Sequence, residues 1–306
     1  MPSTPPSDFA TALAAGPLVL DGGLSDQLAA AGHDLADGLW SARLLLDAPE
    51  AVRAVHRAYF EAGAEVAITA SYQASFEGFA RRGVGRAGAA RLLALGVELA
   101  REAAGGLPGR RRWVAASVGP YGAVTADGSE YRGRYGLSTA ELEAFHRPRL
   151  EALAAAGPDV LALETVPDAD EARALLRAVR GLGVPVWLSF SVAGGRTRAG
   201  QPLAEAFAPA AEADEVVAVG VNCCAPQEAD GAVALAARVT GKPVVAYPNS
   251  GEGWDAAARD WTGGPTFAAE RVAGWLSGGA RLVGGCCRVG PAQIRELAAE
   301  VARVRP

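Results

Sequence analysis

Residues 160–191, VLALETVPDADEARALLRAVRGLGVPVWLSFS, place two apolar runs on either side of a segment rich in alanine and leucine. The runs Val160–Glu164 and Val186–Ser191 predict strands, and Ala169–Leu182 between them predicts a helix. Strands that are apolar throughout are typical of a parallel sheet that is covered by helices. This stretch therefore predicts one strand–helix–strand unit.

The same alternation occurs eight times along the chain. The predicted strands are Leu18–Asp21, Val66–Ser71, Trp113–Val118, Val160–Glu164, Val186–Ser191, Val216–Asn222, Val244–Tyr247 and Arg281–Gly285. The predicted helices are Pro49–Ala62, Ala87–Ala103, Thr139–Ala156, Ala169–Leu182, Leu203–Ala213, Gln227–Thr240, Thr266–Leu276 and Pro291–Arg303. Eight such units predict an α/β fold, a single (β/α)8 TIM barrel over residues 1–306, rather than an open doubly wound sheet. Residues 1–15 are expected to be an irregular N-terminal lead.

Composition excludes several classes of protein. The 306 residues are 50% hydrophobic and carry a formal net charge of -5, which predicts one large globular domain and disfavours a nucleic-acid-binding surface. No apolar stretch is long enough to span a bilayer, and the N-terminal residues contain no basic leader that would indicate a signal peptide. We therefore expect a cytoplasmic protein. No phosphate-binding loop of the Gly-x-x-x-x-Gly-Lys type is visible.

Polar residues gather where the predicted strands end, which is the edge of a barrel that carries the active site. They are Asp21–Gly23, Thr69–Gln73, Glu164–Thr165, Asn222–Cys223, Tyr247–Gly251 and Cys286–Arg288. In a barrel the sixth and eighth strands are separated by one neighbour, so their ends can share one ion. The eighth strand also closes against the first, which brings Asp21 beside that position.

The four cysteines form two adjacent pairs, Cys223-Cys224 and Cys286-Cys287. Buried free thiols are a common alternative, but two such pairs at strand ends favour a thiolate metal site for a soft or borderline ion. A structural zinc site or a redox pair would more often use Cys-x-x-Cys, and a chain of this size does not need disulfides.

Neighbouring side chains on a strand point to opposite faces, so Cys286 and Cys287 can bind one ion only where the strand has ended or twisted. Gly284 and Gly285 are expected to supply the conformational freedom for this turn.

These residues resemble the zinc-dependent homocysteine S-methyltransferases, whose homocysteine-binding domain is a (β/α)8 barrel. The resemblance extends over nearly the whole chain and rests on five motifs. They are Asp21-Gly22-Gly23-Leu24, Ser71-Tyr72-Gln73-Ala74-Ser75, Glu164-Thr165-Val166-Pro167, Gly220-Val221-Asn222-Cys223 and Gly284-Gly285-Cys286-Cys287-Arg288. The chain departs from the family at Thr69-Ala70-Ser71-Tyr72, where Thr-Asn-Thr-Tyr is frequent, and this departure weakens any role for position 70.

The resemblance implies a set of site residues. It assigns the zinc ligands, through which catalysis would proceed, to Cys223, Cys286 and Cys287. Cys224 is then a spare thiol that packs in the core. Asp21 and Glu164 would hold the homocysteine ammonium, and the backbone N–H groups of Gly22 and Gly23 would receive its carboxylate.

Two further residues are assigned to the substrate pocket with alternatives left open. Asn222 would orient the site or cap a loop, and Tyr72 would bind substrate or serve as ordinary packing. Ser129–Gly133 resembles a lid segment of the members that use S-methylmethionine, with a flexible solvated loop as the competing interpretation.

The negative charge of the metal site indicates that the methyl donor is a cation. Three thiolates and Zn²⁺ sum to one negative charge, and the homocysteine thiolate raises this to two, so transfer from a cation neutralises charge. The expected donor is S-methylmethionine, with S-adenosylmethionine as a poorer substitute, and the product is methionine. Aromatic faces suit such a cation, and Tyr72, Tyr247 and Trp254 are the candidates.

Alternatives remain for the substrates and for the class of protein. Betaine could be the donor, and selenocysteine the acceptor. The betaine-using relatives carry a longer C-terminal arm, and the large methionine synthases carry further modules, so both arrangements are less expected here. A non-catalytic zinc or redox sensor would need the cysteine pairs, but it would have no use for Asp21 and Glu164.

Overall fold

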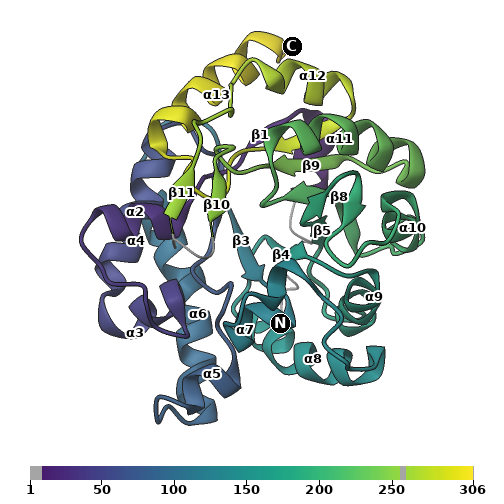
Figure 1. Ribbon diagram of the computed structural model, residues 1–306. Helices are drawn as coiled ribbons and strands as arrows, with labels where there is room; N and C mark the ends of the chain where they lie inside the picture. Colours follow the sequence, from purple (N-terminus) through teal and green to yellow (C-terminus); the bar gives the residue numbers. More distant parts are fainter. Residues whose placement is uncertain (1–8, 256–259, 306) are drawn as a thin grey trace.

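The computed structural model describes residues 9–255 and 260–305, and its centre is an eight-stranded sheet with helices around it (Figure 1). The strands are β1 (Leu18–Val19), β2 (Val66–Ile68), β3 (Trp113–Val118), β4 (Val160–Val166), β5 (Val186–Phe190), β8 (Val216–Asn222), β9 (Val244–Tyr247) and β12 (Ala280–Val283). Their order is β1-β12-β9-β8-β5-β4-β3-β2, and neighbouring strands pair in parallel. The predicted strands are therefore confirmed.

The sheet closes between its first and last strands. Leu20, just beyond β1, forms a parallel bridge with Val66 of β2. The Asp21 N–H adds a hydrogen bond of 3.0 Å to the Val66 carbonyl. The predicted (β/α)8 barrel is thus confirmed, with β12 beside β1 and with β9 between β8 and β12.

The eight predicted helices surround the barrel. They are α4 (Pro49–Glu61), α6 (Arg86–Ala104), α8 (Thr139–Ala155), α9 (Ala169–Ala178), α10 (Leu203–Phe207), α11 (Pro226–Thr240), α12 (Arg271–Ser277) and α13 (Pro291–Val304). Local sequence explains where several begin. Pro49 and Pro226 occupy the first position of their helices, where a missing N–H costs nothing. Ser138 and Glu141 form a capping box at the start of α8.

Helix α10 is shorter than the predicted Leu203–Ala213. Pro209 interrupts it, because proline lacks the N–H that would bond to the Glu205 carbonyl and its ring crowds that carbonyl. The chain continues as a short 3-10 turn, η3 (Ala208–Ala210).

Helix α12 starts later than the predicted Thr266. The N–H groups of Thr266 and Phe267 both donate to the Ser250 carbonyl at 2.8 Å. These bonds tie the segment to the loop after β9, so the helix begins only at Arg271.

The expectation of an irregular lead was wrong for residues 9–15, which form helix α1 (Phe9–Ala15). Residues 1–8 lie outside the described part of the chain. Phe9 and Leu13 are four residues apart and share one helix face, and they are 0% and 1% exposed. Both pack into the cluster inside the barrel, where the Phe9 ring meets the edge of Trp113 at 5.4 Å between centroids. Helix α1 therefore covers the end of the barrel where the strands begin.

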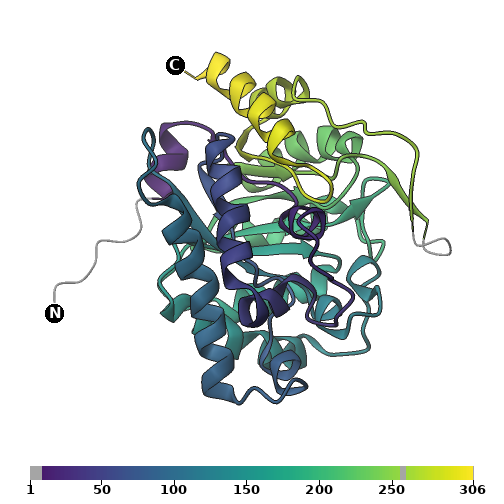
Figure 2. The ribbon, with the colours of Figure 1, turned by 90° about the vertical axis from the view of Figure 1, so that its left-hand side faces the viewer.

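The loops that follow the strands carry further short elements. They are α2 (Leu24–Ala30), η1 (Trp40–Arg43), α3 (Leu44–Asp47), α5 (Phe76–Ala80), α7 (Tyr121–Thr125), η2 (Ser129–Tyr131), the hairpin of β6 (Val192–Ala193) and β7 (Arg196–Thr197), and the hairpin of β10 (Gly253–Asp255) and β11 (Asp260–Thr262). Figure 2 shows the second hairpin extending away from the barrel. Among the described residues, none of these helices or the longer ones has the length and apolarity of a membrane span.

Candidate metal centre and substrate cavity

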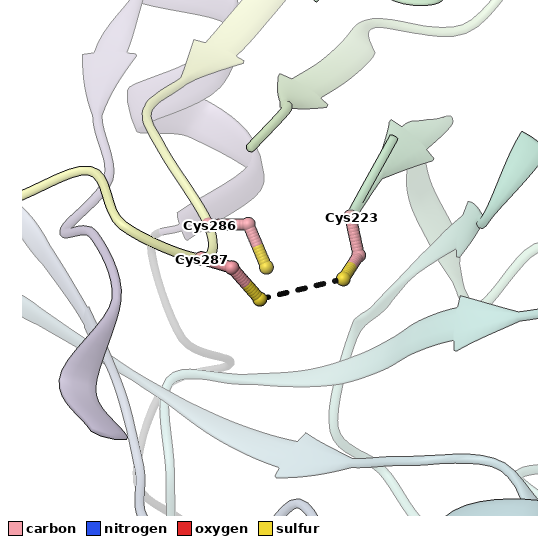
Figure 3. Close-up of side chains that lie close together, drawn as sticks. All are labelled: Cys223, Cys286 and Cys287. Atoms are coloured by element: carbon pink, nitrogen blue, oxygen red, sulfur yellow. Dashed lines mark hydrogen bonds between the residues drawn. The ribbon is translucent and has the colours of Figure 1, made fainter. Parts of the chain in front are cut away.

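Three cysteine sulfurs converge at the ends of two barrel strands (Figure 3). The Sγ atoms of Cys223, Cys286 and Cys287 all lie within 4.8 Å of one another, and those of Cys223 and Cys287 are 3.7 Å apart. A tetrahedral ion with metal–sulfur bonds of about 2.3 Å requires sulfurs about 3.8 Å apart. The three thiols therefore fit a metal ion that keeps a fourth position for another ligand.

The two cysteines after β8 face different surroundings because the chain turns between them. Cys223 has a φ of 48°, in the left-handed region that few residues other than glycine adopt. Its carbonyl accepts a hydrogen bond from the Ser191 hydroxyl at 3.1 Å. Cys224 is 0% exposed and packs in the layer between strands and helices, where burial raises the pKa of its thiol. The structure thus places Cys224 away from the sulfur cluster.

Strand β12 ends at Val283, so the two following cysteines are free of strand geometry, as expected. Neither Gly284 nor Gly285 has a positive φ. Close packing requires glycine at both positions. A Cβ on Gly284 would lie 2.6 Å from the Cβ of Leu20, and one on Gly285 would lie 2.2 Å from a Val289 methyl carbon.

Backbone hydrogen bonds fix the cysteine loop against the loop after β9. The Cys286 N–H donates to the Pro248 carbonyl at 2.8 Å, and the Cys287 N–H donates to Asn249 Oδ1 at 3.2 Å. The Cys287 carbonyl accepts from the Ser250 N–H at 3.0 Å. The positions of Cys286 and Cys287 are therefore set by the fold itself.

Hydrogen bonds couple the ionisation of the three thiols. Hydrogen bonds from Cys286 and Cys287 hold the pKa of Cys223 well below its usual value, and the same contacts with Cys223 raise the pKa of the other two thiols. The Tyr131 hydroxyl lies 3.2 Å from Cys223 Sγ. Because that sulfur raises the pKa of Tyr131, the hydroxyl stays protonated and can donate to a thiolate.

A cavity of about 840 Å³ opens beside the sulfur cluster, and Glu164 lines it. The Glu164 carboxylate accepts hydrogen bonds from the hydroxyls of Ser117 and of Tyr247, the latter at 2.9 Å. Burial raises the pKa of Glu164 to about 7, against the lowering effect of these two hydrogen bonds. A cation that entered here would find a desolvated carboxylate fixed in place.

Asp21 lies at the end of β1 and is 1% exposed. Its Oδ2 accepts the Ile68 N–H at 2.8 Å, whereas its buried Oδ1 has no hydrogen-bond partner among the described residues. Burial raises the pKa of Asp21, and the neighbouring charge of Glu164 adds to that effect. The two carboxyl groups therefore repel each other when both are ionised, and a cation between them would reduce this cost.

The other predicted substrate contacts are placed differently from one another. Gly22, Gly23 and Tyr72 line the cavity. The Gly23 N–H already donates to the Val289 carbonyl at 2.9 Å, so in this structure it does not offer the free donor that was expected. Asn222 is not on the cavity wall.

Asn222 bonds Thr165, a residue of the cavity lining, and does not itself line the cavity. Its Oδ1 accepts the Thr165 N–H at 2.7 Å and the Ser189 hydroxyl at 2.8 Å, and its Nδ2 donates to the Thr165 hydroxyl at 2.7 Å. These contacts hold Thr165, next to Glu164, at a φ of 58°. These contacts agree with the expected alternative that Asn222 orients the site.

The structure describes the side chains of two of the three aromatic candidates for the donor site. Tyr72 and Tyr247 both line the cavity, but Tyr247 is 1% exposed and uses its hydroxyl to bond Glu164. The side chain of Trp254 lies outside the described residues. Sequence reasoning missed Ser117 and Arg198 on the wall, because neither belongs to a motif that it recognised.

Removal of metal is expected to leave the barrel folded. The core clusters and the loop hydrogen bonds do not depend on an ion, in contrast to a zinc finger. An ion present at 1,000 times its dissociation constant stabilises a folded chain by about 4 kcal/mol, so a chelator should lower the melting temperature without removing the cooperative transition. Circular dichroism with and without chelator tests this, and a chelated sample that is unfolded at room temperature would contradict it.

Comparison with known proteins gives a consistent result. Residues 18–301 match the family model described as homocysteine S-methyltransferase. The homocysteine S-methyltransferase YbgG of Bacillus subtilis is 43% identical over 92% of this chain and 93% of its own length. The homocysteine S-methyltransferase of Escherichia coli is 44% identical over 92% of this chain and 94% of its own.

Solved structures agree with the sequence relatives. The metallated form of the homocysteine methyltransferase MmuM from Escherichia coli superimposes with a TM-score of 0.83 at 42% identity, covering 93% of this chain and 96% of that one. The apo form of the same protein gives a TM-score of 0.75.

Proposed function

The chain belongs to the homocysteine S-methyltransferase family, as its motifs predicted, and from that premise we propose that it transfers a methyl group from a small cationic donor to the sulfur of homocysteine. The product is methionine. The convergence of three cysteine sulfurs beside Glu164 in one cavity is the observation that carries this proposal. It joins a site for a thiol to a site for an ammonium group, and homocysteine contains both.

Zinc is the metal that the donor set supports best. Thiolates select soft or borderline ions, and three sulfurs at tetrahedral spacing leave one position open. When bound, the ion would hold and deprotonate the acceptor thiol, so no separate base is needed at neutral pH. Cys223, Cys286 and Cys287 are its proposed ligands.

The remaining residues of the acceptor site position the amino-acid end of homocysteine. We assign its ammonium to Glu164, which lines the cavity, and to Asp21, whose buried Oδ1 has no hydrogen-bond partner among the described residues. Ser117 and Tyr247 keep Glu164 in place through their hydroxyls. The Gly22 N–H is the backbone donor that we assign to the carboxylate.

The charge of the cavity favours a cationic donor. Its described lining contains five carboxylate residues and one cationic residue, which are Asp26, Asp37, Glu130, Glu164, Glu252 and Arg198. In the transfer, the bond between the methyl carbon and the donor sulfonium sulfur breaks and its electron pair stays on that sulfur. A new bond joins the methyl carbon to the homocysteine sulfur. With S-methylmethionine as donor, both products are methionine.

A panel of donors with homocysteine tests the proposal. We expect zinc-loaded protein to form methionine with S-methylmethionine and more slowly with S-adenosylmethionine. Metal analysis of the same preparation should find about one ion per chain. Turnover with betaine alone would overturn the donor assignment, and turnover of selenocysteine in place of homocysteine would overturn the acceptor. A preparation that binds zinc but no thiol would favour a sensor.

A further inference from the structure

Two oppositely charged side chains, Glu130 and Arg198, line the cavity on loops that the acceptor site does not use. Glu130 belongs to η2 after β3, and Arg198 follows the β6–β7 hairpin after β5. Both line the same cavity as the three cysteines. Among the described residues of that lining, Arg198 is the only cationic side chain.

The carboxylate of Glu130 differs from the other acidic groups at the cavity edge. Asp37 bonds Arg82 at 2.5 Å, and Glu252 pairs with Arg288 at 3.2 Å. The buried Oε2 of Glu130 has no hydrogen-bond partner among the described residues, and no described cation forms an ion pair with it. Burial raises the pKa of Glu130, so a cationic ligand would relieve a real electrostatic cost.

The Nε atom of Arg198 is fixed by a hydrogen bond, and its two terminal nitrogens are available to a ligand. Its Nε donates to the Ser191 hydroxyl at 3.1 Å, and its guanidinium carbon lies 5.5 Å from the centre of the Tyr131 ring. Its two terminal nitrogens donate to no residue in the described part of the chain. A guanidinium held in this way presents two parallel N–H donors, which match the two oxygens of a carboxylate.

The two loops that carry this pair are tied to each other. The Arg134 guanidinium, four residues beyond Glu130, donates to the Ala199 carbonyl at 3.0 Å. The Arg134 N–H bonds Asp168 Oδ2 at 3.0 Å, and the Ala199 N–H bonds the Pro167 carbonyl at 2.9 Å. Both loops are thus anchored to the chain after β4, so the spacing of the two charges is set before any ligand binds.

We propose that Glu130 and Arg198 bind the amino-acid head group of the methyl donor, with Glu130 pairing its ammonium and Arg198 its carboxylate. The inference rests on the proposed function, in which one cavity holds two amino-acid substrates. The acceptor has its own charged contact in Glu164, at the end of a different strand. Tyr131 lies between the pair and the metal ligands, with its hydroxyl 3.2 Å from Cys223 Sγ. A sulfonium attached to the head group would therefore face the acceptor sulfur.

The test uses two sulfonium compounds that differ in the head group. S-methylmethionine carries an ammonium and a carboxylate, whereas 4-(dimethylsulfonio)butanoate has the same chain and carries only the carboxylate. We expect Glu130→Gln to raise KM for S-methylmethionine by about 10- to 100-fold, the range for a lost charge-assisted contact, and to leave the second compound unaffected as substrate or competitive inhibitor. Arg198→Gln should weaken both compounds. KM for homocysteine should stay unchanged in both variants.

Controls separate this inference from simple loss of structure. Arg196→Gln removes an exposed arginine of the same hairpin and should change neither KM. Glu130→Asp keeps the charge and should retain the preference for a donor with an ammonium group. Melting curves and zinc content establish that each variant is folded and loaded.

Three outcomes would overturn the inference. They are an unchanged KM for S-methylmethionine in Glu130→Gln, an equal loss for both sulfonium compounds in that variant, and a rise in KM for homocysteine instead. If the wild type transfers no methyl group from any donor, the proposed function fails. Calorimetric binding of S-methylmethionine to wild type and Glu130→Gln then still decides the head-group assignment, and equal affinities reject it.

Discussion

Replacement of Cys286 by serine is expected to remove the metal and, with it, methyl transfer. Three sulfurs are the proposed ligand set among the described residues, and a hydroxyl is a harder and far less acidic ligand than a thiol. Loss of a residue that only supports a metal ligand costs about 10- to 100-fold in affinity or activity, so loss of a ligand should cost more than about 100-fold. Zinc content after dialysis and the rate of methionine formation measure the two effects.

Cys224→Ser is the matched control, because it makes the same chemical change one residue from a ligand. Cys224 is fully buried in the apolar layer, so its replacement should lower stability modestly while zinc content stays near that of the wild type. Equal loss of zinc in both variants would mean that the ligand after β8 is wrongly assigned. Cys223→Ser should behave like Cys286→Ser.

The barrel could be predicted from sequence because its strands and helices differ strongly in residue pattern. All eight strands and all eight outer helices lie where the apolar runs and the alanine-rich segments indicated. The errors occur where tertiary contacts determine whether a helix forms. Helix α1 was missed because seven residues with two apolar side chains, Phe9 and Leu13, give little periodic signal until the open end of the barrel is present to receive them.

The site was predictable as far as its residues occur in motifs at strand ends. Cys223, Cys286, Cys287 and Glu164 were found in this way, and the barrel brings them together. Hydrogen bonds that join distant strands were not predictable. Whether Asn222 faces substrate or supports Thr165 depends on the direction of the chain near the end of β4 and just after β8. Thr165 and Cys223 have left-handed backbone angles at these two places, and no local sequence pattern indicated them.

Replacement of Glu164 by glutamine is expected to weaken homocysteine binding while it stabilises the protein at alkaline pH. Glutamine keeps the shape and can still bond the hydroxyls of Ser117 and Tyr247, but it has no charge for the ammonium group. Removing one partner of a buried charge pair costs about 2–5 kcal/mol, so affinity should fall by at least about 30-fold. Calorimetry at pH 8 measures this loss, and zinc content should not change.

The gain in stability follows from the raised pKa of Glu164. Burial moves this pKa from 4.5 to about 7, so the folded state holds the proton more tightly than the unfolded state. The resulting stabilisation is complete below pH 4.5 and is lost as the pH rises through about 7. At pH 8 the substrate-free wild type therefore folds around an unfavourable buried carboxylate, whereas the glutamine variant does not.

Denaturant unfolding of substrate-free wild type and Glu164→Gln at two pH values isolates this effect. A pKa raised from 4.5 to about 7 corresponds to at most about 3 kcal/mol, and we expect the variant to gain about 1–3 kcal/mol at pH 8. At pH 4.5 the wild-type carboxyl is mostly protonated, so the gain should disappear there. Equal differences at both pH values would show that Glu164 is not held at a raised pKa. Ionised Glu164 thus lowers the stability of the folded protein, whereas homocysteine binding requires the ionised form. Substrate binding, and not folding, therefore explains why this carboxylate is buried in the barrel.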